Sequence, residues 1–238
     1  MLQRMADGDS ELCEKDRDAR LETSRRMSAD AAPPSATHWR FPAGSAEPGV
    51  YRGVGAEVWR WICSAYLRLS GWRMRGDWPR DLPKIVLIAA PHTSNWDGFN
   101  MLAAAGYYRI ALKWMGKKEL TKGPFGGLVR WFGCVPVDRD AKADLVRQMK
   151  DAFAAAAQMT LAVSPEGTRA KSPGWRSGFY HIAHGAGVPI VMSVLDYGAK
   201  TISLSGALIP TGDYDADVAL IKGHYEGARG KYDERFSR

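Results

Sequence analysis

With 238 residues, 45% of them hydrophobic and 25% charged, the chain has the length and composition of a globular protein with one sizeable core. Its longest uninterrupted apolar stretch has about six residues, far short of the roughly 18 to 20 that a membrane-spanning helix needs. The formal net charge is +7, and because residues 1–50 hold seven Lys or Arg against nine Asp or Glu, the remainder carries +9. This surplus favours a phosphate-rich partner, namely anionic lipid, a phosphorylated substrate or nucleic acid.

Residues 1–48 are polar, charged and rich in Ala, Ser, Pro and Gly, which predicts a disordered tail, although a misassigned start codon would leave the same pattern. The first twenty residues lack the apolar segment of a signal peptide, so export by that route is not expected.

Cys13, Cys63 and Cys134 are widely spaced and include no Cys-x-x-Cys pair. They therefore predict neither a disulfide framework nor a zinc site, and they fit a reducing cytoplasm.

Residues 49–80 predict a basic amphipathic helix followed by a linker. Apolar residues recur at helical spacing on one face: Val54, Val58, Trp61, Ile62, Ala65 and Leu69. Another face carries polar residues: Arg52, Arg60, Ser64 and Arg68. The periodicity favours a helix packed on the domain core by its apolar face, and a helix lying in a membrane interface is the alternative.

Residues 81–212 alternate between strand and helix patterns, and residues 213–238 read as a polar C-terminal helix. Strands are predicted over 85–90, 110–115, 134–137, 160–164, 188–195 and 201–205. Helices are predicted over 98–108, 121–132 and 141–158, and around His181. The pattern indicates a single α/β domain with a central, mostly parallel sheet flanked by helices, and residues 196–200 predict an antiparallel hairpin turn.

The strand over 85–90 is continuously apolar, as expected of a strand buried on both faces of a sheet, and a polar turn follows it. That turn holds His92 and, five positions later, Asp97. Residues five apart on a regular helix do not face one another, so the two can meet only if the chain turns between them. Ser94 fits the N-cap of a helix with Asp97 at its third position, which predicts such a turn. The same residues could instead only cap a helix and line a loop.

Three further segments lie at predicted strand ends, and two of them carry an arginine. Gly133 to Arg139 reads GCVPVDR, Ser164 to Arg169 reads SPEGTR, and Gly187 to Ile190 reads GVPI. A guanidinium binds phosphate or carboxylate through two parallel hydrogen bonds, so Arg139 and Arg169 are candidates for an anionic ligand. Gly167 would let the backbone turn tightly.

In their order and spacing, the segments HTSNWD, GCVPVDR, PEGTR and VPI resemble the four motif blocks of the glycerolipid acyltransferases, the lysophosphatidate acyltransferase family. The resemblance covers residues 80–210. It implies transfer of a fatty acyl group from acyl-CoA or acyl carrier protein, as co-substrate, to a hydroxyl of a glycerol phosphate or lysophospholipid. It also implies a peripheral protein on the cytoplasmic face of an anionic membrane, with no metal and no other cofactor.

Carried over by position, the resemblance makes His92 the general base and Asp97 the residue that orients it. The acceptor-binding set is Arg139, Glu166, Gly167, Thr168 and Arg169. A neutral imidazole can take the proton of a hydroxyl as its oxygen attacks a thioester, while a carboxylate on the other ring nitrogen fixes the tautomer. The substrate's hydroxyl thus replaces the serine of a catalytic triad, and no acyl-enzyme is needed.

Alternatives from other classes remain open. The acceptor could be another lysolipid, such as a lyso-amino-acid lipid, or the chain could be a non-enzymatic membrane-surface protein on the same fold. A hydrolase that uses water as the acceptor is a further alternative, but the sequence holds no Gly-x-Ser-x-Gly nucleophile motif to support it. His181 and His184 are three apart on a predicted helix and could share a metal, but no third ligand accompanies them. The nine tryptophans are scattered and lie in no nucleic-acid motif, so no nucleic-acid partner is expected.

Overall fold

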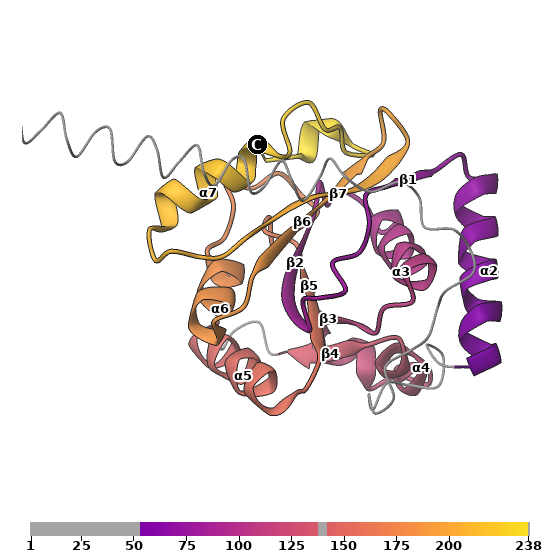
Figure 1. The fold of residues 1–238 in the computed structure, drawn as a ribbon, viewed down its shortest axis with the longest axis horizontal. Coiled ribbons are helices and arrows are strands. Elements are labelled where there is room, and N and C mark those ends of the chain that lie inside the picture. Colours follow the sequence, from indigo (N-terminus) through magenta and orange to yellow (C-terminus); the bar gives the residue numbers. More distant parts are fainter. Residues whose placement is uncertain (1–52, 138–141, 238) are drawn as a thin grey trace, which may run out of the picture.

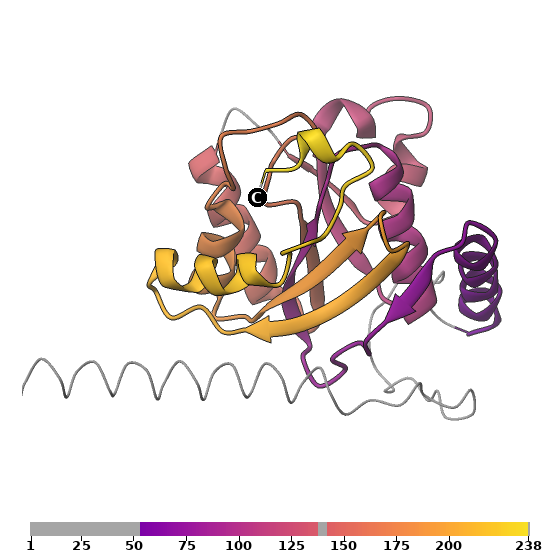
Figure 2. The same cartoon turned by 90° about the horizontal axis from the view of Figure 1, so that it is seen from above.

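Helices cover both faces of a central sheet, and in both views the strands run through the middle of the molecule (Figure 1, Figure 2). The computed structural model describes residues 53–137 and 142–237, so the predicted tail over 1–48 lies outside the described residues. Within the described part, seven strands form one sheet in the order β1-β7-β6-β2-β5-β3-β4. All neighbouring strands are parallel except β6 and β7, which form the predicted antiparallel hairpin. The predicted α/β class is confirmed.

The predicted strands are present with ends displaced by a few residues, as are the helices predicted over 98–108 and 141–158 and around His181. The helix predicted over 121–132 is shorter, with α-helix only over Gly126–Trp131. The C-terminal helix predicted over 213–238 was wrong in extent: it ends at Gly223, because glycines at 223, 227 and 230 interrupt it and the chain continues in turns. The strands are β1 (Arg73–Arg75), β2 (Lys84–Ala90), β3 (Leu112–Lys117), β4 (Cys134–Val137), β5 (Met159–Val163), β6 (Ile190–Asp196) and β7 (Thr201–Leu208). The helices are α2 (Gly53–Leu69), α3 (Trp96–Tyr108), α4 (Gly126–Trp131), α5 (Lys142–Ala155), α6 (Gly178–Ala186) and α7 (Tyr214–Gly223), with short 3-10 helices η2 (Lys118–Thr121) and η3 (Asp233–Arg235). β1 was not expected, because three residues reading Arg-Met-Arg carry no strand pattern. It pairs with β7 at one edge of the sheet.

The two faces of β2 pack into two different hydrophobic cores. Val86 and Ile88 belong to a core that includes residues of α5 and α6. Ile85 and Leu87 belong to a second core, with residues of α3. The views agree, since α3 lies on one side of the sheet and α5 and α6 lie on the other (Figure 1, Figure 2). The continuous apolar run of β2 therefore reflects burial on both sides, as the sequence predicts.

Helix α2 lies outside α3 (Figure 1). The apolar face that was expected to pack on the core is turned outward. All six residues of that face are exposed, with Trp61 at 64% and Leu69 at 90%. The helix packs instead through Ala56, Cys63 and Leu67. The prediction failed because α2 is apolar on two faces, and periodicity marks an apolar face without saying what covers it.

Close packing of α2 against α3 depends on a glycine. A Cβ at Gly106 of α3 would collide with the sulfur of Cys63 and with the Trp59 ring. An ion pair between Glu57 and Arg109 links the start of α2 to the end of α3. No helix in the described residues is long and apolar enough to cross a membrane.

Candidate active site

Three neighbouring parallel strands bring polar side chains to one edge of the sheet. β2 lies between β5 and β6 and runs parallel to both, so their carboxyl ends meet at the same edge. His92 follows β2, Glu166 follows β5 and Tyr197 follows β6. Open α/β sheets bind ligands at this edge, because the loops there converge on one place.

Helix α3 begins one residue later than the predicted N-cap at Ser94 implies. Asn95 occupies the N-cap position and makes no side-chain cap hydrogen bond, so Ser94 is not the N-cap and Asp97 is the second helical residue. The carboxylate of Asp97 nevertheless reaches back, as in a capping box, and accepts the Ser94 backbone N–H at 2.7 Å. Ser94 Oγ donates to Asp97 Oδ1 at 2.6 Å instead of capping the backbone. The carboxylate thus holds the turn by which His92 and Asp97 meet.

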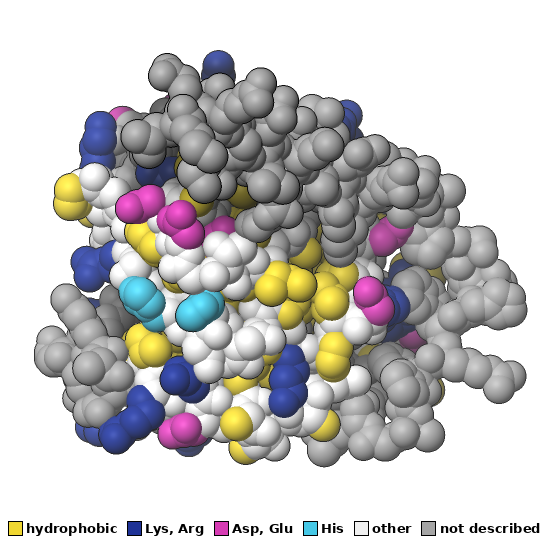
Figure 3. Space-filling view, turned by 60° about the vertical axis from the view of Figure 1, so that its left-hand side comes forward, with side chains coloured by type: hydrophobic (Ala, Val, Ile, Leu, Met, Phe, Trp, Pro, Cys, Tyr) yellow, Lys and Arg dark blue, Asp and Glu magenta, His cyan; other side chains and the backbone are white. Residues whose placement is uncertain are grey.

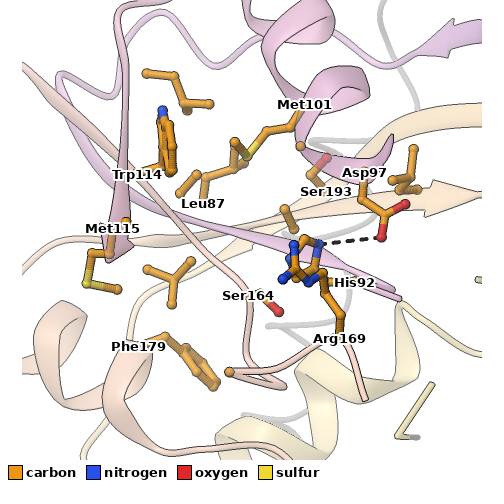
Figure 4. A pocket seen from close by; sticks show the side chains of 18 of the residues that line it. Leu87, His92, Asp97, Met101, Trp114, Met115, Ser164, Arg169, Phe179 and Ser193 are labelled. Atoms are coloured by element: carbon orange, nitrogen blue, oxygen red, sulfur yellow. Dashed lines mark ion pairs between the residues drawn. The ribbon is translucent and has the colours of Figure 1, made fainter. Parts of the chain in front are cut away.

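His92 and Asp97 face each other, with His92 Nδ1 3.4 Å from Asp97 Oδ2 (Figure 4). Asp97 is only 3% exposed. Besides the Ser94 contacts, its carboxylate accepts the Thr93 backbone N–H at 2.7 Å and the Tyr197 hydroxyl at 2.6 Å. Burial alone would raise the pKa of Asp97, but hydrogen bonds from His92, Ser94 and Tyr197 outweigh it and hold the pKa below its ordinary value. An ionised Asp97 directs the imidazole proton to Nδ1 and leaves Nε2 as an acceptor.

Glu166 lies directly behind the histidine and is fully buried, with 0% of its surface exposed. Its Oε1 accepts the backbone N–H of His92 at 2.7 Å, while Oε2 has no hydrogen-bond partner among the described residues. Burial raises its pKa from 4.5 to about 7, against the lowering effect of the His92 N–H. This residue, expected in the acceptor-binding set, is therefore placed where it supports the backbone of His92.

Gly167 permits the loop after β5 to fold beside Arg176. Its φ of 65° lies in the left-handed region that favours glycine. A Cβ at this position would lie 2.5 Å from Cδ and 2.6 Å from Nε of Arg176. A side chain at position 167 would therefore both strain the backbone and displace a guanidinium from the same loop.

The remaining predicted binding residues differ in their surroundings. Arg169 is exposed and donates a hydrogen bond to the Asn95 side chain, so the loop after β5 touches the start of α3. Thr168 Oγ1 accepts the backbone N–H of Ala170 at 3.2 Å and holds a turn of its own loop. Arg139 lies outside the described residues. Thr168 and Arg169 thus share one loop with Glu166 and Gly167, next to the histidine.

His92, Asp97 and Arg169 line a cavity of about 1820 Å³ (Figure 4). Its walls combine two kinds of side chain. Cationic residues on the wall are Lys117, Arg169, Arg176 and Arg235. Large apolar residues include Leu87, Met101, Trp114, Met115 and Phe179. The cavity can therefore receive a molecule with an anionic part and a long apolar part.

His181 and His184 on α6 have packing roles. The His181 ring stacks on Tyr214 with centroids 6.3 Å apart, and the His184 ring stacks on Tyr180 at 6.1 Å. The face over α6 and α7 shows histidine side chains close to acidic ones (Figure 3). Among the described residues, no group of three or more His, Cys, Asp or Glu side chains could hold a metal ion.

Sequence reasoning missed Tyr197 and Arg176. Tyr197 directly follows β6, a buried strand parallel to β2. A polar residue at the end of a buried strand is the same signal that pointed to His92, but the sequence pattern places Tyr197 only in a hairpin turn. Arg176 lies in no recognisable motif, and only the fold of its loop brings it to the cavity wall. No sequence pattern marks such a residue.

The fold and the site define a class of protein: an α/β domain with a histidine–aspartate pair at the carboxyl edge of its sheet, beside a cavity with cationic and apolar walls. Residues 78–195 match the family model described as Acyltransferase, and the chain belongs to this family. Its fold is similar to that of the 1-acyl-sn-glycerophosphate (LPA) acyltransferase PlsC from Thermotoga maritima. That match has a TM-score of 0.50 and 17% sequence identity, and covers 71% of this chain and 76% of the other. No curated protein matches the chain.

Proposed function

We propose that this protein transfers a fatty acyl group from a thioester, acyl-CoA or acyl-acyl carrier protein, to a hydroxyl of a lysophospholipid or glycerol phosphate of the 1-acyl-glycerol-3-phosphate type. This activity would serve phospholipid biosynthesis or remodelling. The observation that carries the proposal is the buried His92–Asp97 pair in the wall of a cavity with cationic and apolar sides. Membership of the acyltransferase family and a fold like that of a lysophosphatidate acyltransferase support it.

In the proposed reaction, His92 Nε2 removes the proton of the acceptor hydroxyl as the oxygen attacks the carbonyl carbon of the thioester. A new C–O bond forms, the C–S bond breaks, and the leaving thiolate takes the proton from the imidazolium to become a thiol. Asp97 stays ionised throughout and stabilises the imidazolium through Nδ1–H. The thioester is already activated, so the histidine and the acceptor hydroxyl complete the transfer without an acyl-enzyme.

The acceptor's phosphate would bind at the cationic part of the cavity wall, where Arg169 and Arg176 lie on one loop. Gly167 and Thr168 shape that loop, and Glu166 fixes the histidine next to it. Arg139 is the further candidate from the sequence. The fatty acyl chain would lie along the apolar walls, near Leu87 and Met101, because burying methylene groups is favourable.

A lysophospholipid acceptor and the acyl chain of the donor have apolar parts, and exposed apolar side chains favour docking of the protein on an anionic membrane. The outer face of α2 exposes an unbroken apolar stripe, and Trp96 and Phe99 at the start of α3 are also exposed. Exposed apolar patches of this kind mark interaction surfaces, and the net charge of +7 adds attraction to anionic lipid. We infer a peripheral protein on the cytoplasmic membrane face.

The test is acyl transfer from radiolabelled acyl-CoA and acyl-acyl carrier protein to a panel of acceptors: lysophospholipids, glycerol 3-phosphate and lyso-amino-acid lipids. His92→Ala, purified in the same way, is the blank for contaminating enzymes. Labelled acylated product from the wild-type protein and none from the blank would establish the activity and identify the acceptor. No product from any pair, with vesicle binding retained, would replace the proposal by a non-enzymatic membrane-surface role.

A further inference from the structure

A chain of hydrogen-bonded side chains connects the aspartate of the dyad to helix α2. The Tyr197 hydroxyl donates to Asp97 Oδ1 at 2.6 Å, and Asn100 Nδ2 donates to the Tyr197 hydroxyl at 3.1 Å. The Tyr66 hydroxyl in turn donates to Asn100 Oδ1 at 3.0 Å. Residues from α2, α3 and the turn after β6 are thus joined in one line that ends at the dyad.

The direction of every bond in this chain is fixed by chemistry. An ionised carboxylate only accepts, so the Tyr197 hydroxyl must donate to Asp97 and its oxygen is left to accept. Asn100 must then present its NH₂ group to Tyr197, which leaves its carbonyl oxygen for the hydroxyl of Tyr66. All donors therefore point toward Asp97, an arrangement in which successive bonds strengthen one another.

Tyr197 differs from the other groups that bind this carboxylate. Thr93, Ser94 and His92 belong to the same short loop as Asp97 and move with it. Tyr197 comes from a different part of the chain, and its own backbone N–H donates to the Arg229 carbonyl at 2.9 Å. Among the described residues it is therefore the donor that ties the dyad loop to the neighbouring strand.

The surroundings hold the chain in place. Asn100 is 2% exposed, and Tyr66 and Tyr197 pack against a core formed by Cys63, Leu67, Trp72, Ala103, Leu195 and Ile202. The Tyr197 ring meets Trp72 edge to face, with centroids 4.9 Å apart. Burying a polar group costs free energy unless it is hydrogen-bonded, so this chain of hydrogen bonds favours one arrangement of α2, α3 and the turn after β6.

We propose that Tyr197 and Asn100 are positioning residues for the His92–Asp97 dyad, and that Tyr66 extends this support to helix α2. The inference rests on the proposed function for its kinetic consequence, while its structural content concerns only how Asp97 is held. Without the Tyr197 hydroxyl, Asp97 Oδ1 loses its link to β6 and keeps only the Ser94 hydroxyl, so the carboxylate is held less firmly and its contact with His92 Nδ1 weakens. Because α2 carries the exposed apolar stripe on its opposite side, the same helix would contact lipid on its outer face and support the dyad on its inner face.

The kinetic test compares Tyr197→Phe with the wild-type enzyme. We expect kcat to fall about tenfold, the loss of one hydrogen bond to a charged group, with the KM of both substrates unchanged. In the Asp97→Asn background the same change should have little further effect, because the two groups act as a unit. Tyr107→Phe is the matched control, since Tyr107 is a partly exposed tyrosine of α3 whose hydroxyl makes no hydrogen bond with the described residues, and it should retain full activity.

A second readout does not depend on turnover. Nitrogen-15 NMR of labelled histidine, with the His92 signals assigned from His92→Gln, reports whether the proton resides on Nδ1. Wild type should show the Nδ1–H form, and Tyr197→Phe should shift toward a mixture of tautomers. If the wild-type protein transfers no acyl group, the proposed function fails, and the NMR comparison still decides this inference. Unchanged kcat in an active enzyme, or an unchanged His92 spectrum, would overturn it.

Should Tyr197→Phe fail to fold, Tyr66→Phe at the far, partly exposed end of the chain carries the same test. It should lower kcat about twofold and move the His92 signals in the same direction, because its effect passes through Asn100. A Tyr66→Phe protein with wild-type kcat and wild-type His92 signals would then count against the chain as a unit.

Discussion

The loop after β2 and the loop after β5 border the same cavity and are built in opposite ways. In the first, Thr93, Ser94 and Asp97 are buried and the carboxylate is surrounded by donors. In the second, Glu166 at the strand end is buried, but Gly167 and Arg169 beyond it are exposed, and Arg169 contacts only the Asn95 side chain among the described hydrogen-bonding groups. The partner of the base is thus preorganised by burial, whereas Arg169, a cation that would meet the acceptor, lies on an exposed part of its loop.

The largest expected effect lies in the buried loop. Asp97→Asn should lower kcat on the order of 100-fold or more, because an amide no longer fixes the His92 tautomer and presents NH₂ to neighbours that are all donors. Steady-state kinetics with the acceptor identified in the panel measure the loss. Asp81→Asn, an exposed carboxylate before β2, is the control. An Asp97→Asn enzyme within threefold of wild type would show that the buried loop does not orient the base.

The carboxyl group of Glu166, behind the histidine, should make the stability of the fold depend on pH. Burial raises the pKa of Glu166 from 4.5 to about 7, so the folded protein holds this proton more tightly than the unfolded chain does. Its contribution to the free energy of unfolding is therefore complete below about pH 4.5 and is lost as the pH rises through about 7. Relative to Glu166→Gln, the wild-type protein should lose up to about 3 kcal/mol between pH 5 and pH 8.

Urea unfolding of both proteins at the two pH values measures this difference. The exposed Glu226 supplies the control, since Glu226→Gln should leave the pH dependence unchanged. Parallel pH profiles for wild type and Glu166→Gln would mean that Glu166 is not held neutral in the fold.

A smaller effect is expected in the exposed loop. Arg169→Ala should raise the KM of a phosphate-bearing acceptor about tenfold and change kcat less than about twofold, because a guanidinium that holds phosphate acts on binding. Lys171→Ala, a change of charge two residues along the same loop, should leave KM near its wild-type value. If Arg169→Ala instead lowers kcat with KM unchanged, the exposed loop takes part in the chemical step and the contrast between the two loops fails.

The smallest effect tests the membrane-facing helix. Ile62→Ser should weaken binding to anionic phospholipid vesicles about fivefold, since part of an apolar side chain is lost from the proposed lipid contact. Ile209→Ser, at a still more exposed isoleucine that follows β7, should bind as wild type does. Equal losses in both variants would remove the special role of the outer face of α2.

The sequence predicted the features that depend on neighbouring residues and missed those that depend on distant ones. The run over 85–90 predicted β2, and the polar turn after it predicted His92 and Asp97 as a pair, because strand burial and chain geometry are local. The contacts that hold Asp97 include one from Tyr197, one hundred positions away, and no local pattern reports such a distant partner. For Glu166, spacing in a motif indicated proximity to the site but not burial behind the histidine.

Helix α2 marks a different limit. Its periodicity identified an apolar face correctly, yet that face points outward, and the helix packs through Cys63 and Leu67. Hydrophobic spacing indicates that one face of a helix is shielded from water, and either a protein core or a lipid surface can shield it. Only the position of α3 decides which face is covered by protein.

Whether His92 acts as the general base is decided by kcat of His92→Ala for the donor and acceptor found in the panel, with and without added imidazole. Removing the base should lower kcat roughly 100-fold or more, and imidazole diffusing into the space left by the side chain should restore part of the rate. Turnover within about threefold of wild type, with no response to imidazole, would show that His92 is not the base.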